Sequence, residues 1–270
     1  MREHLRFYRH RWFKVWIAMI ALSAALIAVI QAVGNQAVLP AAFFYGAAAG
    51  PIALLVAIHD RTGIGNSVPG TTLIGMFLFG GGVALMIGGY FDSLLITSKN
   101  GPTILRVGWI EEAAKIVPPL AVALKGRYLT KAAGVALGLS CATGFAVMES
   151  MSYAWKSIHS DGVIGAGTVL FIRGLTTPFS HLVWTGLICA IAFGVWEVKG
   201  RVVITLPIVG AFVAAAVLHS LNDGLLTIDI PGPARLLFIG VAAVSYWLFY
   251  RATRDLKPPR VVLGPEPLRV

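Results

Sequence analysis

The chain has 270 residues, of which 57% are hydrophobic and only 13% are charged, and its mean hydropathy is +0.79. Soluble globular domains carry about 25% charged residues, so this composition excludes an ordinary soluble domain and favours a membrane protein. The net charge of +10 does not call for a nucleic-acid partner, because the basic residues are divided among tails and loops. The orientation of membrane proteins and the attraction of basic segments to anionic lipid account for such charges.

Apolar segments long enough to cross a bilayer follow one another along the chain. A transmembrane helix needs about 20 mostly apolar residues. Eight segments meet this requirement, at about Trp12–Val33, Val38–Ile58, Thr71–Ile96, Thr103–Leu124, Ala132–Trp155, Thr177–Trp196, Val202–Asn222 and Ala234–Tyr250. A further stretch, Val163–Thr176, fits a short or re-entrant helix. The sequence therefore predicts an all-α polytopic membrane protein with about eight transmembrane helices.

The basic residues predict how the chain is oriented. Most of the 22 lysines and arginines lie in the N-terminal tail, in every second loop and in the C-terminal tail. Because cytoplasmic loops carry the excess of lysine and arginine, both termini are expected in the cytoplasm. The predicted organisation is a basic cytoplasmic tail at 1–14, one transmembrane domain at 15–250, and a basic cytoplasmic tail at 251–270.

Three charges stand together in the fourth predicted span. The stretch WIEEAAKIVPP carries Glu111, Glu112 and Lys115. On insertion scales each charge near the centre of a membrane helix costs about 2.5–3.5 kcal/mol. Lys115 is four residues from Glu111 and three from Glu112, so it shares a helix face with them and partly neutralises them. Ionisable residues kept at such a cost indicate a functional site.

Polar residues of three other spans lie at the same depth as this glutamate pair. Glu149 precedes the outer end of the fifth span, and His181 lies in the first turn or two of the sixth. His219 and Asp223 fall in the last two turns of the seventh span, and Arg173 could bring a positive charge to the rim. Each residue alone could be a structural ion pair or an interfacial contact. The shared depth, in the outer half of the bilayer, instead predicts one site.

Three functions fit buried glutamates and histidines in a membrane. A carboxylate in such a place can act as general base on a water, and histidines can hold zinc or donate to an oxyanion, which suits hydrolysis. Proton- or ion-coupled transport also uses buried carboxylates and histidines. Transporters often show internal repeats with broken helices in both halves, and this chain shows neither clearly. A membrane scaffold would not need the shared depth.

Four motifs resemble those of the PrsW family of intramembrane proteases, part of the CAAX-prenyl-protease and bacteriocin-processing superfamily. They are EEAAK at 111–115, FAVME at 145–149, the RGLTTPFSH segment ending in His181, and HSLND at 219–223. The resemblance covers about Thr103 to Gly224, the expected catalytic half at 103–224. It implies cleavage of a membrane-embedded protein near the extracytoplasmic side of a bacterial cell membrane. In family members this is the first cut of a single-span anti-sigma factor.

The resemblance also implies roles for single residues. Glu111 or Glu112 would activate the attacking water, and Glu149 would lie beside that water. His181 and His219 would complete the site. Asp223 would orient His219, and Lys115, Arg173 and Phe145 would support the site.

The cofactor stays open at this level. His181, His219 and Glu149 could hold a zinc ion, while relatives are also argued to work as glutamic-type proteases without metal. The expected partners are a membrane-embedded protein substrate and the lipid bilayer, and no nucleic acid.

Overall fold

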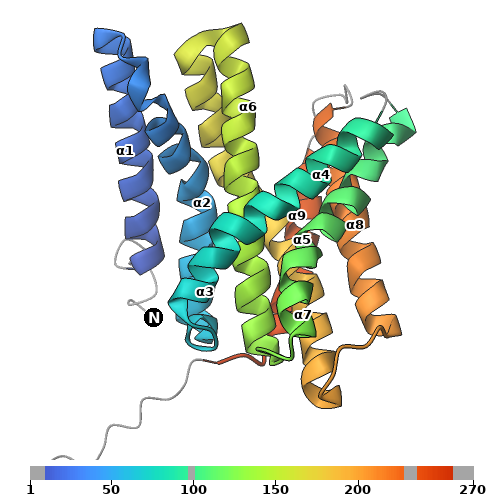
Figure 1. Cartoon of the computed structure of the whole chain (residues 1–270). Coiled ribbons are helices and arrows are strands. Elements are labelled where there is room, and N and C mark those ends of the chain that lie inside the picture. Colours follow the sequence, from blue (N-terminus) through green and yellow to red (C-terminus); the bar gives the residue numbers. More distant parts are fainter. Residues whose placement is uncertain (1–9, 97–100, 228–235, 258–270) are drawn as a thin grey trace, which may run out of the picture.

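The computed structural model describes residues 10–96, 101–227 and 236–257, and within these ranges every regular element is helical (Figure 1). This confirms the all-α prediction for the described part of the chain. In chain order the helices are α1 (Arg11–Val33), α2 (Leu39–Thr62), α3 (Gly70–Gly75), α4 (Gly81–Leu95), α5 (Val107–Leu124), α6 (Lys131–Thr176), α7 (His181–Lys199), α8 (Leu206–Thr227) and α9 (Leu237–Thr253). A π-helical turn, Met76–Gly80, joins α3 to α4.

The helices identify a polytopic membrane protein. Five helical stretches of the described residues are long and apolar enough to cross a membrane, namely Arg11–Val33, Gln36–Thr62, Gly70–Leu95, Lys131–Lys199 and Leu206–Leu225. A shorter apolar helix follows at Leu237–Thr253. Helix α5 coincides with the fourth predicted span, but three charges interrupt its apolar sequence. Each of the eight predicted spans overlaps a helix of the described residues, and the number of crossings stays a prediction.

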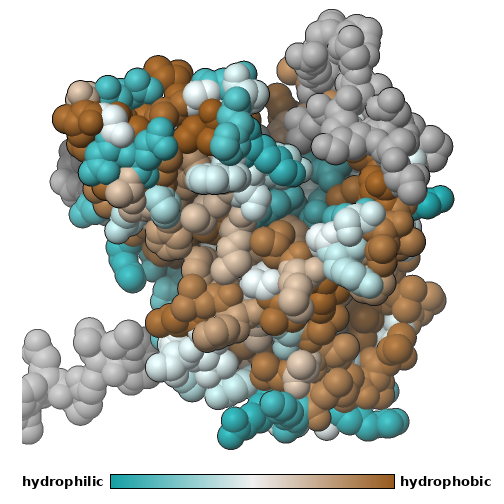
Figure 2. Space-filling view, turned by 45° about the horizontal axis from the view of Figure 1, so that its top comes forward, coloured by the Kyte–Doolittle hydropathy of each residue, from teal (hydrophilic) through white to brown (hydrophobic). Residues whose placement is uncertain are grey.

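The outer surface is apolar between the two ends of the molecule. Large hydrophobic side chains are exposed along α1, α4 and α9, among them Leu22, Val29, Met86 and Ile239. In Figure 2 hydrophobic side chains cover much of the face between hydrophilic groups at the two ends. A soluble monomer rarely exposes so much contiguous apolar surface, and such a surface is expected where side chains contact the hydrocarbon of a bilayer.

Helices α6 and α7 form the centre of the bundle. Every residue of α6 from Ala133 to Val147 is buried, and so is every residue of α7 from His181 to Ala190. A helix that is apolar on all sides requires neighbours on all sides. Helices α2, α4, α5 and α9 supply those neighbours, and α8 closes the bundle against α5 and α7.

Helix α6 folds back on itself at Gly162. This residue has φ 68° and ψ −168°, a conformation that glycine adopts without the steric cost of a side chain. The returning arm, Val163–Thr176, is the stretch whose sequence fits a short or re-entrant helix. It packs beside α2 and ends just before His181, so it delivers α7 to the middle of the bundle (Figure 1).

One end of the bundle collects basic residues. Arg11 Nη1 lies 3.2 Å from Asp60 Oδ1, which joins the start of α1 to the end of α2. Lys131 Nζ lies 2.7 Å from Asp255 Oδ1, which joins the start of α6 to the residues after α9. Partial burial raises the pKa of Asp255, but the hydrogen bond from Lys131 and its positive charge lower this pKa by more. The pKa of Asp255 therefore lies below its ordinary value. The positive-inside rule predicts that this end is cytoplasmic.

Parts of both predicted tails lie outside the described residues, namely 1–9 and 258–270. Helix α1 begins at Arg11 and α9 ends at Thr253, so helical structure extends a few residues into each predicted tail. Lys99, which follows the third predicted span, and Arg235, at the start of the eighth, also lie outside the described ranges.

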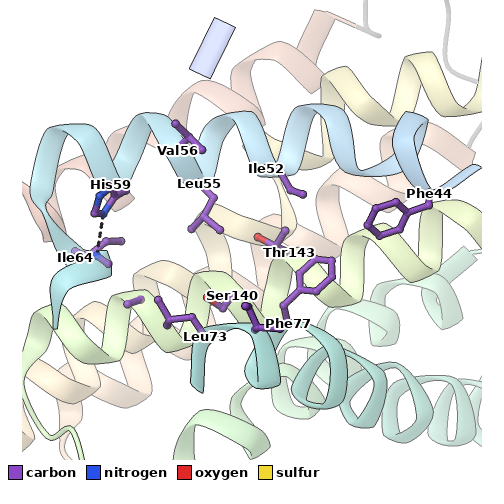
Figure 3. A pocket seen from close by; sticks show the side chains of 13 residues that line it. Phe44, Ile52, Leu55, Val56, His59, Ile64, Leu73, Phe77, Ser140 and Thr143 are labelled. Atoms are coloured by element: carbon purple, nitrogen blue, oxygen red, sulfur yellow. Dashed lines mark hydrogen bonds between the residues drawn. The ribbon is translucent and has the colours of Figure 1, made fainter. Parts of the chain in front are cut away.

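An apolar groove of about 380 Å³ lies between α2, α3 and α6 (Figure 3). We call it the α2–α6 groove, and Phe44, Leu55, Val56 and Phe77 line it. His59 stands at one end, where its Nδ1 accepts a hydrogen bond of 3.0 Å from the backbone N–H of Gly65.

Candidate active site

Helix α5 brings two glutamates and a lysine into the interior. Lys115 Nζ lies 3.3 Å from Glu111 Oε2 and 2.9 Å from Glu112 Oε1, as the helical spacing predicts. Glu112 and Lys115 are fully buried, and Glu111 is 6% exposed. Glu112 also accepts a 2.9 Å hydrogen bond from the hydroxyl of Thr185. Both oxygens of Glu112 are therefore engaged by donors of the protein.

His219 approaches the glutamates from α8. Its Nδ1 lies 3.0 Å from Glu112 Oε1, and its Nε2 lies 3.5 Å from both Glu111 Oε2 and Asp223 Oδ2. The indole of Trp184 stacks on the imidazole, with 4.4 Å between the ring centroids. Both ring nitrogens of His219 thus face carboxylates, and the stacked indole fixes the plane of the ring.

A break in the chain places His181 at the start of α7. Pro178 has no backbone N–H, and the residues Thr177–Phe179 form a 3₁₀ turn between the returning arm of α6 and α7. The imidazole that follows lies inside the bundle, with Nδ1 2.8 Å from Lys115 Nζ and Nε2 3.3 Å from Glu149 Oε2. The ring of Phe145 packs against it and lies 4.2 Å from Lys115 Nζ.

Glu149 is held by an arginine of the returning arm. Arg173 donates from Nη2 to Glu149 Oε2 and from Nε to Ser150 Oγ, the latter over 2.9 Å. Its guanidinium lies 4.3 Å from the centroid of the Tyr153 ring. The Gly162 reversal makes these contacts feasible, because it brings residues 24 positions apart in one helix side by side.

A cavity of about 650 Å³ separates the site residues into two groups. Glu111, Glu149, Arg173, His181 and Asp223 line it. The other members of the predicted site lie behind this wall, fully buried, and they are Glu112, Lys115, Phe145 and His219. The cavity also reaches the ends of α4 and α8, at the end of the bundle away from the basic residues.

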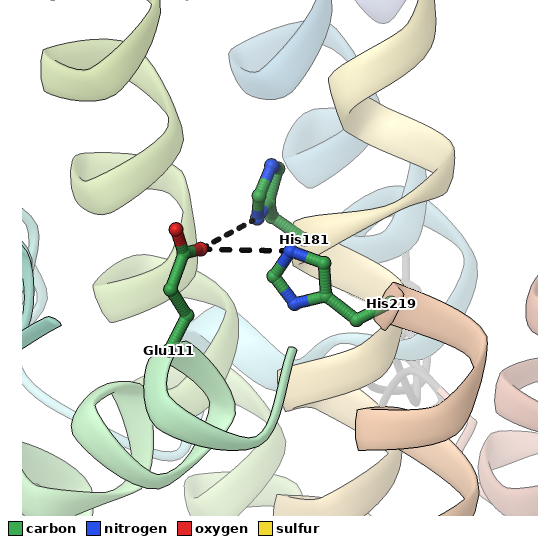
Figure 4. Close-up of side chains that lie close together, drawn as sticks. All are labelled: Glu111, His181 and His219. Carbon is green, nitrogen blue, oxygen red and sulfur yellow. Dashed lines mark ion pairs between the residues drawn. The ribbon is translucent and has the colours of Figure 1, made fainter. Parts of the chain in front are cut away.

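The three residues Glu111, His181 and His219 could hold a metal ion (Figure 4). One ligand atom from each lies within 4.8 Å of the others. Among the described residues, Glu111 Oε2 and His219 Nε2 are buried atoms without a hydrogen-bond partner, as expected where a cation belongs. Two histidines and one glutamate are also a known ligand set for catalytic zinc. Binding through His181 requires the ammonium of Lys115 to turn toward Glu112.

This ligand set differs from the one suggested by the sequence. The predicted carboxylate was Glu149, whose oxygen is engaged by Arg173. In the structure the carboxylate grouped with the two histidines is Glu111. Glu111 Oε2 lies 3.5 Å from His219 Nε2, whereas Glu149 Oε2 lies 3.3 Å from His181 Nε2.

Sequence reasoning missed three residues of the site. Thr185 follows His181 by one helical turn, a spacing that places both on one face. Trp184 stacks on His219, and its apolar surroundings in the sequence gave no signal. Asp92 of α4 lines the cavity, and its Oδ1 is buried without a hydrogen-bond partner among the described residues. The depth argument used for the other charges would have found Asp92, since it lies near the outer end of the third span.

The comparison with protein families gives one match. The description of that family is PrsW family intramembrane metalloprotease, and the match spans residues 68–251. The chain belongs to the PrsW family. The match begins after α2 and includes every residue of the candidate site, so it confirms the resemblance carried by the four motifs. No curated protein and no solved structure matches the chain.

Membership of the PrsW family identifies the chain as an intramembrane metalloprotease. It thereby favours hydrolysis over ion transport and over a scaffold role. The buried group of Glu111, His181 and His219 is consistent with the catalytic metal site of such an enzyme.

Proposed function

We propose that this PrsW family protein cleaves a peptide bond of a membrane-embedded protein inside the cavity, near the extracytoplasmic side of a bacterial cell membrane. The observation that carries the proposal is the convergence of Glu111, His181 and His219, of which Glu111 and His181 line the cavity and His219 lies directly behind them. That cavity lies at the end of the bundle opposite the basic residues. The proposed substrate class is a single-span membrane protein, such as an anti-sigma factor.

Glu111, His181 and His219 would hold a zinc ion, which when bound acts as a Lewis acid on the peptide carbonyl. Glu112 prepares one of these ligands. A carboxylate can only accept, so the Nδ1–H of His219 donates to Glu112 and the lone pair remains on Nε2, beside Glu111. Such an outer partner fixes the tautomer and orientation of a metal-binding histidine.

Glu149 is the proposed general base. It lines the cavity, and Arg173 donates a hydrogen bond that holds its carboxylate there. In this role Glu149 takes a proton from the attacking water and returns it to the leaving amine. The proposal therefore moves the base from the pair Glu111 and Glu112 to Glu149, because Glu112 is closed off from the cavity and Glu111 belongs to the ligand set.

The test uses the purified protein in liposomes together with a panel of single-span reporter proteins. We expect wild-type protein to release a fragment whose new terminus, determined by mass spectrometry, lies near the extracytoplasmic end of the span. Glu149→Gln should abolish cleavage while the protein retains its zinc. A wild-type protein that cleaves no reporter, or a Glu149→Gln variant with full activity, would contradict the proposal.

A further inference from the structure

A second apolar groove, of about 450 Å³, runs along the other side of α2. We call it the α1–α2 groove. Its lining residues come from α1, from α2 and from the segment before α7, and they include Trp12, Trp16, Leu54, Ala57, Pro178 and Phe179. Helices α1 and α2 precede the part of the chain that matches the PrsW family, so the groove is built largely from segments outside that match.

The segment Arg173–His181 separates this groove from the catalytic cavity. Gly174, Leu175, Pro178 and Phe179 line the groove, whereas Arg173, Thr176, Thr177, Ser180 and His181 line the cavity. One stretch of nine residues is therefore the wall between the two spaces. The last residue of the wall, His181, lines the cavity and belongs to the candidate metal site.

This wall is where the helical backbone is interrupted. Thr177–Phe179 form a 3₁₀ turn, and Ser180 has φ −118° and ψ −94°, so the regular hydrogen-bond ladder is broken beside the cavity. On the far side Phe179 packs edge-on against Tyr246 of α9, with 6.1 Å between the ring centroids. Both rings are partly exposed on the apolar surface.

Helix α2 holds the other side of the wall at backbone distance. A Cβ on Gly50 would lie only 1.6 Å from the carbonyl oxygen of Gly174. Small residues let helix backbones approach this closely in membranes. The close contact between α2 and the wall is at Gly174, and Thr177–Ser180 extend beyond this contact toward α9.

From the shared wall the groove and the cavity extend toward opposite ends of the bundle. Trp12 and Trp16 belong to the first two turns of α1, at the end where Arg11 binds Asp60. The cavity reaches Ile96 at the end of α4 and Asn222 near the end of α8, at the opposite end of the bundle. A transmembrane helix that lies in the groove with one end beside Trp12 and Trp16 would thus have its opposite end level with the cavity.

We infer that the α1–α2 groove is the docking site for the transmembrane helix of the substrate, whose extracytoplasmic end crosses the wall at Thr177–Ser180 to enter the cavity. The inference rests on the proposed function. An apolar groove inside a membrane accepts an apolar occupant, and the wall that this groove shares with the catalytic cavity selects the substrate helix. Trp12 and Trp16 stand where aromatic residues mark the membrane interface.

The α2–α6 groove provides a matched comparison (Figure 3). It is also apolar, but it contains no residue of the wall. Leu54 lines the α1–α2 groove and its neighbour Leu55 lines the α2–α6 groove, and both are partly buried. One substitution at either position fills a different groove on the same helix.

The first test compares Leu54→Trp with Leu55→Trp, using a single-span reporter that wild-type protein cleaves and a short water-soluble peptide with the same cleavage sequence. Leu54→Trp should raise KM for the reporter about tenfold, which corresponds to about 1.4 kcal/mol of binding, and leave peptide hydrolysis within about twofold. Leu55→Trp should leave both unchanged. Equal reporter kinetics in the two variants would overturn the inference. If Leu54→Trp does not fold, Ala57→Phe fills the same groove.

The second test does not depend on activity. A photoreactive phenylalanine analogue replaces Leu54 or Leu55 in the Glu149→Gln background, and the protein is irradiated with the reporter in liposomes. Cross-links to the span of the reporter are expected from position 54 and not from position 55. Cross-links to lipid or to a second copy alone, or equal yields from both positions, would overturn the inference. If the reporter cross-links from position 54 but even the wild-type protein does not cleave it, the proposed function fails and the groove remains a docking site for a transmembrane helix.

Discussion

The carboxylate of Glu112 and the imidazole of His219 form a fully buried pair, with 3.0 Å between Oε1 and Nδ1. This pair gives two adjacent glutamates different tasks. Glu112 is engaged by Lys115, Thr185 and His219 and is closed off from the cavity, whereas Glu111 lines the cavity. The two positions should therefore respond differently to the same substitution.

Glu111→Gln should abolish cleavage and lower the bound zinc, because it removes the carboxylate ligand. Glu112→Gln should lower the free energy of unfolding by about 1–3 kcal/mol, since three buried donors lose their acceptor or its charge. Thermal unfolding in detergent and zinc stoichiometry distinguish the two effects. Glu197→Gln, at an exposed carboxylate near the basic end, serves as the control. Full cleavage by Glu111→Gln would remove this residue from the site.

Glu149→Gln should reduce kcat by about 10²–10⁴-fold, the range for loss of a general acid or base, while zinc content and the unfolding midpoint stay close to those of wild type. Arg173→Lys should reduce kcat less, because a charge near Glu149 remains while the second hydrogen bond to Ser150 is lost. Steady-state kinetics with a single-span reporter measure both changes. Loss of zinc from Glu149→Gln would instead place Glu149 among the ligands.

Removal of the metal by a chelator should abolish cleavage, and addition of zinc should restore it. His219→Gln should raise the zinc concentration needed for half-maximal activity by more than about tenfold, because it removes a ligand rather than an outer partner. Metal analysis accompanies each activity measurement. Undiminished cleavage by protein freed of metal would support a glutamic-type mechanism.

Water should reach the site from the extracytoplasmic side only. A cysteine at Thr176, which lines the cavity, should react with a membrane-impermeant thiol reagent added on that side. A cysteine at Val135 or Ala190 should stay unlabelled from either side, since both residues are buried in the bundle and neither lines the cavity. Wild-type protein is the control, because its two cysteines are buried. Labelling at Val135 that depends on an ion gradient would point to transport.

Trp184 connects the site to α9. Its ring stacks on His219, and its Nε1–H donates to Ser245 Oγ over 2.8 Å. Trp184→Ala should reduce the free energy of unfolding by about 3–5 kcal/mol, as expected when a buried aromatic side chain leaves a cavity. Trp184→Phe retains a stacked ring and should cost less. Equal unfolding midpoints for the two variants, measured in detergent, would contradict a packing role for this ring.

The sequence by itself determined the helical class and the positions of the apolar segments, and it predicted a common depth for the charged groups. Apolar length and helical spacing are local properties, so they could be read from the chain. They placed Glu111, Lys115, His181 and His219 at one level, and the structure brings these residues into contact. The four motifs carried the family as well.

Only the tertiary structure decided which atoms meet. The rotation of α5 against α7 and α8 turns Glu111 to the cavity and Glu112 to His219, although the two residues are adjacent in the sequence. The reversal at Gly162 pairs Arg173 with Glu149, and it creates the wall between groove and cavity. These relations depend on packing between segments that are distant in the sequence. The spacing of residues along one helix does not reveal how that helix is rotated against its neighbours.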